Sequence, residues 1–242
     1  MDICTSKYLK MKKLISCLII AIAVISCSKE KTGNMIVKGT ITDLKKGTVY
    51  LQKYIDTVLV SVDSVQLDGT GQFTLVDNVD SPEIYYVTLN DINTEKIYFF
   101  GDKGEINVTS KLEKFATSAK ITGSKIHDKM MEHRKMISQF NNRQLELFKE
   151  KFDAQKANDT ALLSKLLKEE KNLIKRKYYY TTNFAVTNAD SEIAPFLALS
   201  ELYNANFQLL DTVNNSLSEK VKTSKYGKEL EKYILRIKDT TK

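Results

Sequence analysis

Cysteine is scarce in this chain of 242 residues, and all three cysteines lie within the first 27 positions. After Cys27 the sequence contains no thiol, which excludes an internal disulfide bond and a Cys-x-x-Cys redox pair from residues 28–242. A thiolate is the nucleophile of thiol–disulfide exchange, so residues 28–242 are not expected to perform that reaction themselves. Their stability must come from packing.

Histidine is equally sparse, with two residues in the chain. His127 and His133 are six positions apart, whereas a zinc-binding helix uses a pair at i and i+4, so we expect no metal site and no cofactor. We interpret His133 as a hydrogen-bonded packing residue. Asp63-Ser64 has no neighbouring histidine that could activate the serine, and a turn role is favoured. We therefore expect no catalytic residue and no enzymatic activity.

An apolar run at residues 14–25 follows two lysines and ends at the pair Ser26-Cys27. This order resembles the export signal of a bacterial lipoprotein, in which a small residue precedes the cysteine that receives lipid. A signal segment needs positive charge and an apolar stretch of about 7–15 residues. A membrane-spanning helix needs about 20 apolar residues, more than the uninterrupted run provides.

We therefore expect residues 1–26 to be a signal peptide, cleaved between Ser26 and Cys27, with either Met1 or Met11 as the start. Acyl chains such as palmitate contribute about 0.8 kcal/mol per buried methylene, so two or three of them on Cys27 would hold the protein on a membrane. The predicted location is the cell envelope, at the outer membrane facing the periplasm or the cell surface. The alternative leaves Cys27 unmodified at the end of a signal or anchor helix.

The net charge of +7 is a mild basic excess. Removal of residues 1–26 would take away four lysines and one aspartate, which leaves a net charge of about +4. The excess is spread along the chain rather than clustered, so it predicts a solvated surface with some attraction to anionic lipid and no nucleic-acid partner.

Residues 27–34 are polar after the cysteine and are expected to form a flexible tether. Between residues 35 and 122, short alternating runs such as Val58, Val60 and Val62 predict about eight strands of an antiparallel β-sandwich or small barrel. Asp68-Gly69 is a strong hairpin signal, because glycine adopts positive φ without steric cost. The glycines at 69–71 and 101–104 lack the Lys-Ser or Lys-Thr of a phosphate-binding loop and are interpreted as turns.

From Ser124 onward the apolar period becomes helical, which assigns residues 123–242 to a helical region and the whole chain to the α+β class. Two stripes recur at steps of three, four or seven: Ile126, Met130, His133, Ile137, Phe140 and Leu147, then Leu163, Leu167, Ile174, Tyr178 and Ala185. The turn-like residues 157–159 between them predict a long antiparallel hairpin. The stripes are expected to be core; alternatively, the apolar seam receives a partner protein.

Shorter helices are expected at residues 191–203, 207–222 and 225–238, and Asp190 or Ser191 is placed to cap the first of them. Tyr178, Tyr179 and Tyr180 are consecutive, and three such residues on a helix cannot all face one core. At least one should be exposed or lie at a contact between domains. They form a candidate contact surface or a belt near lipid headgroups; packing of the hairpin against the β unit is the favoured alternative.

A further aromatic group occupies two of the predicted strands, and its side chains must point to both faces of the sheet: Tyr85, Tyr86, Tyr98, Phe99 and Phe100. We expect one of these faces to be covered by the helices.

Several short segments together resemble the domain of unknown function 4369 family: Val37 to Ile41, Val49 to Leu51, Val62 to Val65, Gly71 to Phe73, Phe99 to Ile106 and Ile121 to Ser124. The resemblance covers about residues 35 to 236. It implies the amino-terminal module of envelope lipoproteins that carry a thioredoxin-like disulfide reductase as their next part. This sequence lacks that part and its cysteine pair, so the reductase activity does not carry over.

The expected function is therefore that of a lipid-anchored envelope protein acting as a non-catalytic binding or scaffold module. Its expected partners are membrane lipid, through acylated Cys27, and an unknown envelope protein. One alternative is an accessory role in thiol–disulfide redox chemistry with a separate thioredoxin-like protein. Another is a lipoprotein that binds a small molecule or glycan in a concave pocket.

Overall fold

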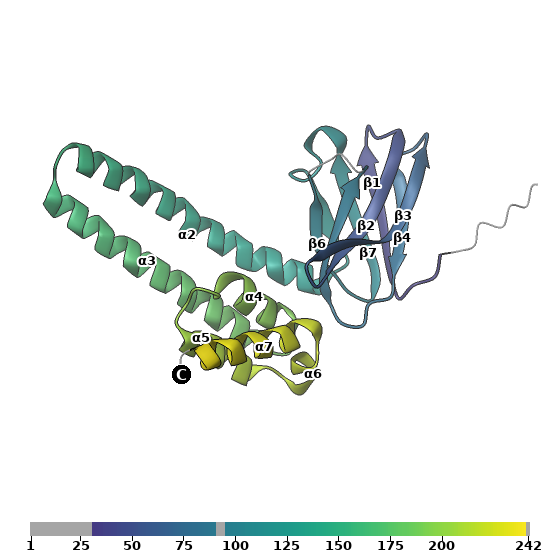
Figure 1. The fold of residues 1–242 in the computed structure, drawn as a ribbon. Helices are drawn as coiled ribbons and strands as arrows, with labels where there is room; N and C mark the ends of the chain where they lie inside the picture. The colour runs from purple at the N-terminus through teal and green to yellow at the C-terminus, as the bar shows by residue number, and fades with distance from the viewer. Residues whose placement is uncertain (1–30, 91–94, 241–242) are drawn as a thin grey trace, which may run out of the picture. The chain divides into compact units, whose positions relative to one another are not determined.

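The computed structural model describes residues 31–90 and 95–240. The predicted signal peptide, the cleavage position after Ser26 and the acylation site Cys27 lie outside these ranges. From Gly33 onward the chain forms one compact unit, in which strands come first and helices follow (Figure 1). In the two described ranges no helix has the length and hydropathy needed to cross a membrane.

Eight strands form two four-stranded sheets, with strand orders β4-β1-β7-β8 and β3-β2-β5-β6. Their bounds are β1 (Met35–Thr42), β2 (Lys46–Ile55), β3 (Val58–Asp68), β4 (Gln72–Asp77), β5 (Glu83–Leu89), β6 (Ile97–Gly101), β7 (Gly104–Lys111) and β8 (Lys120–Thr122). A short 3-10 turn, η1 (Leu112–Lys114), follows β7. The two sheets enclose a common apolar core, so the β unit is a sandwich rather than a closed barrel.

The strand pairs are antiparallel except for β1 and β7, which run parallel from Met35 opposite Gly104 to Thr42 opposite Lys111. The sequence predicted an antiparallel unit, and that prediction is wrong for this pair. A parallel pair requires a crossover connection, and the strands from β2 to β6 provide it.

The sandwich core follows the alternation seen in the sequence. Val37 and Ile41 of β1 point inward and are fully or almost fully buried. Between them Gly39 lies beneath the ring of Phe73 on β4, and a Cβ at this position would lie 2.0 Å from a ring carbon. Gly39 is therefore required by the close approach of an aromatic ring from the neighbouring strand.

The long hairpin consists of α2 (Lys125–Lys156) and α3 (Thr160–Thr187). Ser124 caps α2 by accepting a hydrogen bond from the amide of His127 at 3.2 Å, and Asp159 caps α3 by accepting one from the amide of Leu162 at 2.9 Å. The predicted stripe on α2 is confirmed, since all its members are buried except Phe140, which is half-buried. On α3 the prediction is wrong at Leu167, which is 50% exposed.

Four shorter helices follow: α4 (Ile193–Glu201), α5 (Phe207–Ser216), α6 (Glu219–Lys222) and α7 (Lys225–Thr240). The single helix predicted at 207–222 is interrupted, because Leu217 is extended and Ser218 begins α6 by accepting a hydrogen bond from the amide of Val221. The predicted cap of α4 is also wrong. Its N-cap is Glu192, and no side chain caps the helix.

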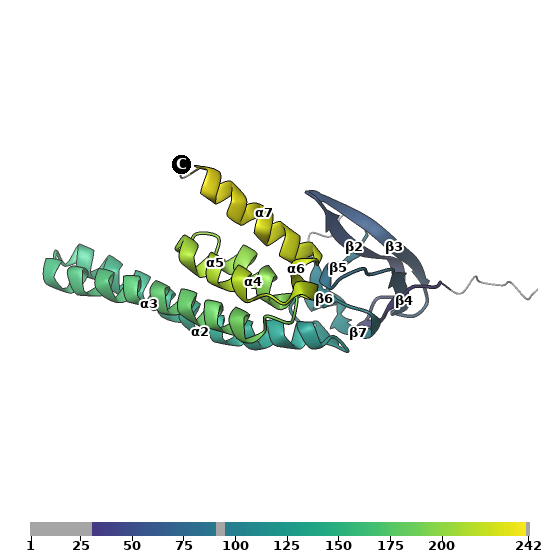
Figure 2. The same cartoon turned by 90° about the horizontal axis from the view of Figure 1, so that it is seen from below.

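The helices cover the outer face of the β3-β2-β5-β6 sheet at β5 and β6 (Figure 2). Ile84 and Phe100 of the sheet pack there against Ile126 and Met130 of α2 and against Ile193 of α4. Tyr85 and Phe99 point the other way, into the sandwich core. The prediction that aromatic residues occupy both faces and that the helices cover one of them is confirmed.

Candidate functional site

An ion-pair network joins the sandwich to the start of α7. Lys53 Nζ of β2 lies 2.8 Å from Asp77 Oδ2 and 3.1 Å from Glu83 Oε1, and Tyr85 Oη donates to Asp77 Oδ2 at 2.6 Å. The second oxygen of Glu83 lies 2.5 Å from Lys225 Nζ of α7. One carboxylate on the rim of the sandwich thus bridges a sheet lysine and a helix lysine.

The pKa shifts of Lys53 and Asp77 have the directions expected of an ion pair. Burial alone would lower the pKa of Lys53, but hydrogen bonds and attraction to Asp77 and Glu83 raise it above its ordinary value. Burial alone would raise the pKa of Asp77, and its hydrogen bonds with Lys53 and Tyr85 lower it instead. The pKa of Tyr85 is raised, mainly by burial and next by the hydrogen bond to Asp77. At neutral pH the lysine and the aspartate are therefore charged and the tyrosine is neutral.

Two hydrogen bonds strengthen the same join. The amide of Ile84 donates to Tyr226 Oη at 3.0 Å, and the amide of Lys225 donates to Ser81 Oγ at 3.2 Å. The rings of Tyr226, Phe100 and Phe196 meet edge to face beside them, at centroid distances of 5.2 to 5.9 Å. The first turn of α7 is therefore fixed against the sandwich by polar and apolar contacts together.

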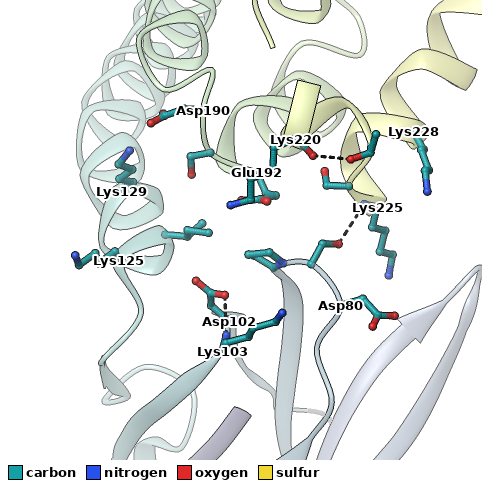
Figure 3. A pocket seen from close by; sticks show the side chains of 16 residues that line it. Asp80, Asp102, Lys103, Lys125, Lys129, Asp190, Glu192, Lys220, Lys225 and Lys228 are labelled. Atoms are coloured by element: carbon teal, nitrogen blue, oxygen red, sulfur yellow. Dashed lines mark hydrogen bonds between the residues drawn. The ribbon is translucent and has the colours of Figure 1, made fainter. Parts of the chain in front are cut away.

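Beside this join lies a cleft of about 700 Å³, between the sandwich and the helices (Figure 3). Loops of the sandwich, the first turns of α2, the residues before α4 and the segment from α6 to α7 line it. Its charged lining comprises six lysines and four carboxylates: Lys103, Lys125, Lys129, Lys220, Lys225 and Lys228, with Asp80, Asp102, Asp190 and Glu192. The lining thus carries more positive than negative charge.

The lysines approach the cleft from different sides. Figure 3 shows Lys125 and Lys129 on the α2 wall, and Lys220 and Lys228 on the opposite wall with α6 and α7. Among residues whose positions are described, Lys225 alone of the six has an ion-pair partner within 4.0 Å, namely Glu83. The other five lysines of the lining have no such partner to neutralise their charge within residues 31–90 and 95–240.

The residues before α4 add two buried polar groups to the lining. Glu192 is 3% exposed and Ser191 is 8% exposed. Ser191 Oγ has no hydrogen-bond partner in the described part of the chain. A buried hydroxyl without a partner is uncommon in folded proteins, and such a group requires an explanation.

The structure gives the three consecutive tyrosines different surroundings. Tyr178 packs against the cluster formed by α4, α5 and α7. Tyr179 is 47% exposed, with Lys175 Nζ 5.6 Å from its ring centroid. Tyr180 stacks on His133 of α2 at 5.7 Å. Of the three, Tyr179 alone is exposed, as the helical geometry required for at least one of them.

The two histidines are buried separately. His133 is 1% exposed, and its Nε2 lies 3.0 Å from Thr181 Oγ1, so the prediction of a hydrogen-bonded packing residue is confirmed. His127 is 4% exposed, and its Nδ1 has no partner among the described residues. Within residues 31–90 and 95–240 no three metal-ligating side chains of His, Cys, Asp or Glu lie together.

The cleft could not have been located from the sequence. Its lining residues range from Asp80 to Lys228 and follow no short motif. Lys125 and Lys129 are the one pair with informative spacing, because residues at i and i+4 share a helix face. Lysines on a helix face are commonly solvated, so this pair alone would not have identified a site.

Comparison with known proteins finds a similar family for the amino-terminal part of this fold. A family described as "Domain of unknown function (DUF4369)" matches residues 35–130, which cover the sandwich and the beginning of α2. No curated protein and no solved structure matches the chain. The described helices after β8 show no thioredoxin-like domain. Residues 35–130 of this chain are therefore similar to the DUF4369 family.

Proposed function

We propose that the protein is a lipid-anchored, non-catalytic binding module of the cell envelope and that the charged cleft is its binding site. The observation that carries this proposal is the convergence of six lysines from the sandwich and three helices on one cleft. A single surface helix with lysines is ordinary. Lysines supplied by separate segments to one concavity point to recognition.

The construction of the cleft supports binding. Its walls are tied together by the ion pairs of Glu83 with Lys53 and Lys225, and by the hydrogen bond from Ile84 to Tyr226. A site whose walls are already fixed loses little conformational entropy when a ligand enters, which favours affinity. The sandwich contributes the floor of the cleft and the helices contribute its sides.

The anchor is the second part of the proposal. According to this proposal Cys27 carries fatty acyl chains, because a small residue and an apolar run precede it. Residues 27–34 then form the tether. Eight extended residues span at most about 30 Å, so the tether keeps the start of β1 within that distance of the lipid. The cleft would then meet ligands at or close to a membrane surface.

Metabolic labelling tests the anchor. Cells that produce the full chain are fed an alkyne-tagged fatty acid, and the wild type is compared with Cys27→Ala and with the control Cys17→Ala. We expect label in the wild type and the control and none in Cys27→Ala, because acylation requires that one sulfur. Persistent labelling of Cys27→Ala would refute the anchor.

Crosslinking with mass spectrometry in native envelopes tests the binding role. We expect recurrent crosslinks to one envelope component from lysines of the cleft, such as Lys125 and Lys220, above those from Lys165 on α3. A thioredoxin-like protein as the recurrent partner would favour the accessory role in redox chemistry. Crosslinks distributed evenly over all lysines would contradict a binding site at the cleft.

The purified mature chain should not reduce insulin above background, since residues 28–242 contain no thiol and Cys27 is the proposed acylation site. Turnover in that assay would contradict the non-catalytic assignment.

A further inference from the structure

We infer that the ligand of the cleft carries a phosphate ester, held between the α2 wall and the wall formed by α6 and α7. This inference rests on the proposed function, in that it assumes the cleft is a binding site. It adds the chemical class of the ligand. Four features of the lining lead to it.

The first feature is the position of the lysines on their helices. Lys125 is the first residue of α2, and Lys225 and Lys228 are the first and fourth residues of α7. The amino end of a helix carries partial positive charge, so lysine is unfavourable there and an anion is favourable. Lys225 is already paired with Glu83, so Lys125 and Lys228 are the two lysines at helix starts that oppose stability unless an anion occupies the cleft between them.

The second feature is the uncapped start of α4. No side chain caps this helix, and its first residues follow Ser191 and Glu192 directly at the cleft. The start of α4 is itself buried: Ile193 and Ala194 are 0% exposed, the amide of Ala194 donates to the carbonyl oxygen of Ser191 at 3.0 Å, and proline at position 195 has no amide hydrogen. α4 therefore favours an anion in the cleft through its helix dipole rather than through free amides.

The third feature is the unsatisfied hydroxyl of Ser191. The residue lines the cleft and is more than nine-tenths buried, and its Oγ has no partner among the described residues. A buried hydroxyl without a hydrogen bond is destabilising, and a phosphate oxygen at this place would accept its proton. This group points to a ligand independently of the helix ends.

The fourth feature is the set of carboxylates in the lining, which restricts the chemical class of the ligand. Glu192 is 3% exposed and has no side-chain hydrogen bond or ion pair within the described ranges, and Asp80, Asp102 and Asp190 also line the cleft. Carboxylates repel a bare anion but accept hydrogen bonds from hydroxyl or ammonium groups. The lining therefore fits a phosphate ester with donor groups, a chemistry shared by soluble glycerol phosphates and phospholipid headgroups.

Lysine footprinting tests the inference at residue resolution. The full-length chain in detergent is acetylated briefly, and modification at each lysine is measured by mass spectrometry. Glycerol 3-phosphate forms the soluble arm, and vesicles of phosphatidylglycerol, against phosphatidylcholine, form the lipid arm. We expect several-fold protection of Lys125, Lys129, Lys220 and Lys228 in at least one arm, with Lys165 and Lys168 of α3 unchanged.

The arm that gives protection identifies the source of the phosphate. Protection by glycerol 3-phosphate indicates a soluble ester, and protection by phosphatidylglycerol alone indicates a headgroup. Absence of protection in both arms, or equal protection of Lys165 and Lys168, would overturn the inference.

A matched pair of double variants separates the site from general charge. K125Q/K129Q removes two charges from the cleft, and K165Q/K168Q removes two from the same hairpin away from it. By calorimetry with the protecting probe, K125Q/K129Q should lose about tenfold or more in affinity, the effect of losing a charge-assisted hydrogen bond, while the control binds as wild type. Equal losses in the two variants would overturn the inference.

The melting temperature of K125Q/K129Q without ligand should be unchanged or higher than that of the wild type, because Lys125 opposes the helix dipole. A marked fall would mean that these lysines serve the fold, and it too would overturn the inference. Failure of phosphate binding while Cys27 labelling and cleft crosslinks persist would leave the proposed function intact. Phosphate binding without labelling would refute the anchor and leave the ligand class intact.

Discussion

His133 shows how strongly its surroundings determine the behaviour of one residue in this protein. Its imidazole lies between α2 and α3, stacked on Tyr180 and close to Phe184. The pKa of His133 is lowered to about 4, mainly by burial and next by the positive charge of Lys177. The ring is therefore neutral at pH 7 in the folded chain, while the unfolded chain has an ordinary histidine pKa of about 6.5.

This difference in pKa predicts a loss of stability in mild acid. Between about pH 6.5 and 4 the unfolded state binds the proton and the folded state does not, so the free energy of unfolding falls as pH falls. From pH 7.5 to 5, His133 should contribute a loss of about 2 kcal/mol. Urea denaturation of the wild type and His133→Gln at both pH values measures it.

The variant should lose less stability than the wild type over the same interval. Burial also lowers the pKa of His127, in the same direction, and the comparison between the two proteins cancels that contribution. Identical pH dependence in the two proteins would show that His133 is not buried in the neutral form.

At the scale of elements, the hairpin of α2 and α3 has a buried and an exposed apolar side chain at adjacent positions of α2. Leu147 is fully buried against α3, whereas Phe148 is 63% exposed. Leu147→Ala should therefore lower the free energy of unfolding by about 2–5 kcal/mol, because it leaves a cavity. Phe148→Ala should change it by less than about 0.5 kcal/mol. Chemical denaturation of the two variants provides the comparison. A larger effect from Phe148→Ala would show that the face of α2 that carries Phe148, and not the face that carries Leu147, packs against α3.

The elements were largely predictable because their signals are local. Alternation at Val37 and Ile41 and the apolar stripe from Ile126 to Leu147 reflect periods of two and 3.6 residues, which any segment of chain displays by itself. The predictions were wrong where contacts with a neighbouring element determine which side chain is buried. Leu167 matches a stripe by spacing, yet α3 is turned so that Leu166 faces α2.

At the scale of the whole molecule, the sequence could not have located the site. Glu83 and Lys225 are 142 positions apart, and nothing in their local sequence indicates that they pair. The same holds for Lys103 and Lys220, which share a cleft only after the helices have packed on the sandwich. The lysine content was visible, but its convergence is a property of the tertiary fold.

Because Glu83 bridges a sheet lysine and a helix lysine, its removal should weaken the sandwich and the helices together. Glu83→Gln should lower the free energy of unfolding by about 2–4 kcal/mol, since Lys53 and Lys225 lose a shared, largely buried partner. Glu105→Gln is the matched control, because Glu105 pairs with Lys38 on the surface of the sandwich and should matter little. Hydrogen exchange resolved to β5 and α7 should show both elements losing protection equally in Glu83→Gln. Loss confined to α7, with β5 unchanged, would mean that the helices open independently and that the cleft is not held as one structure.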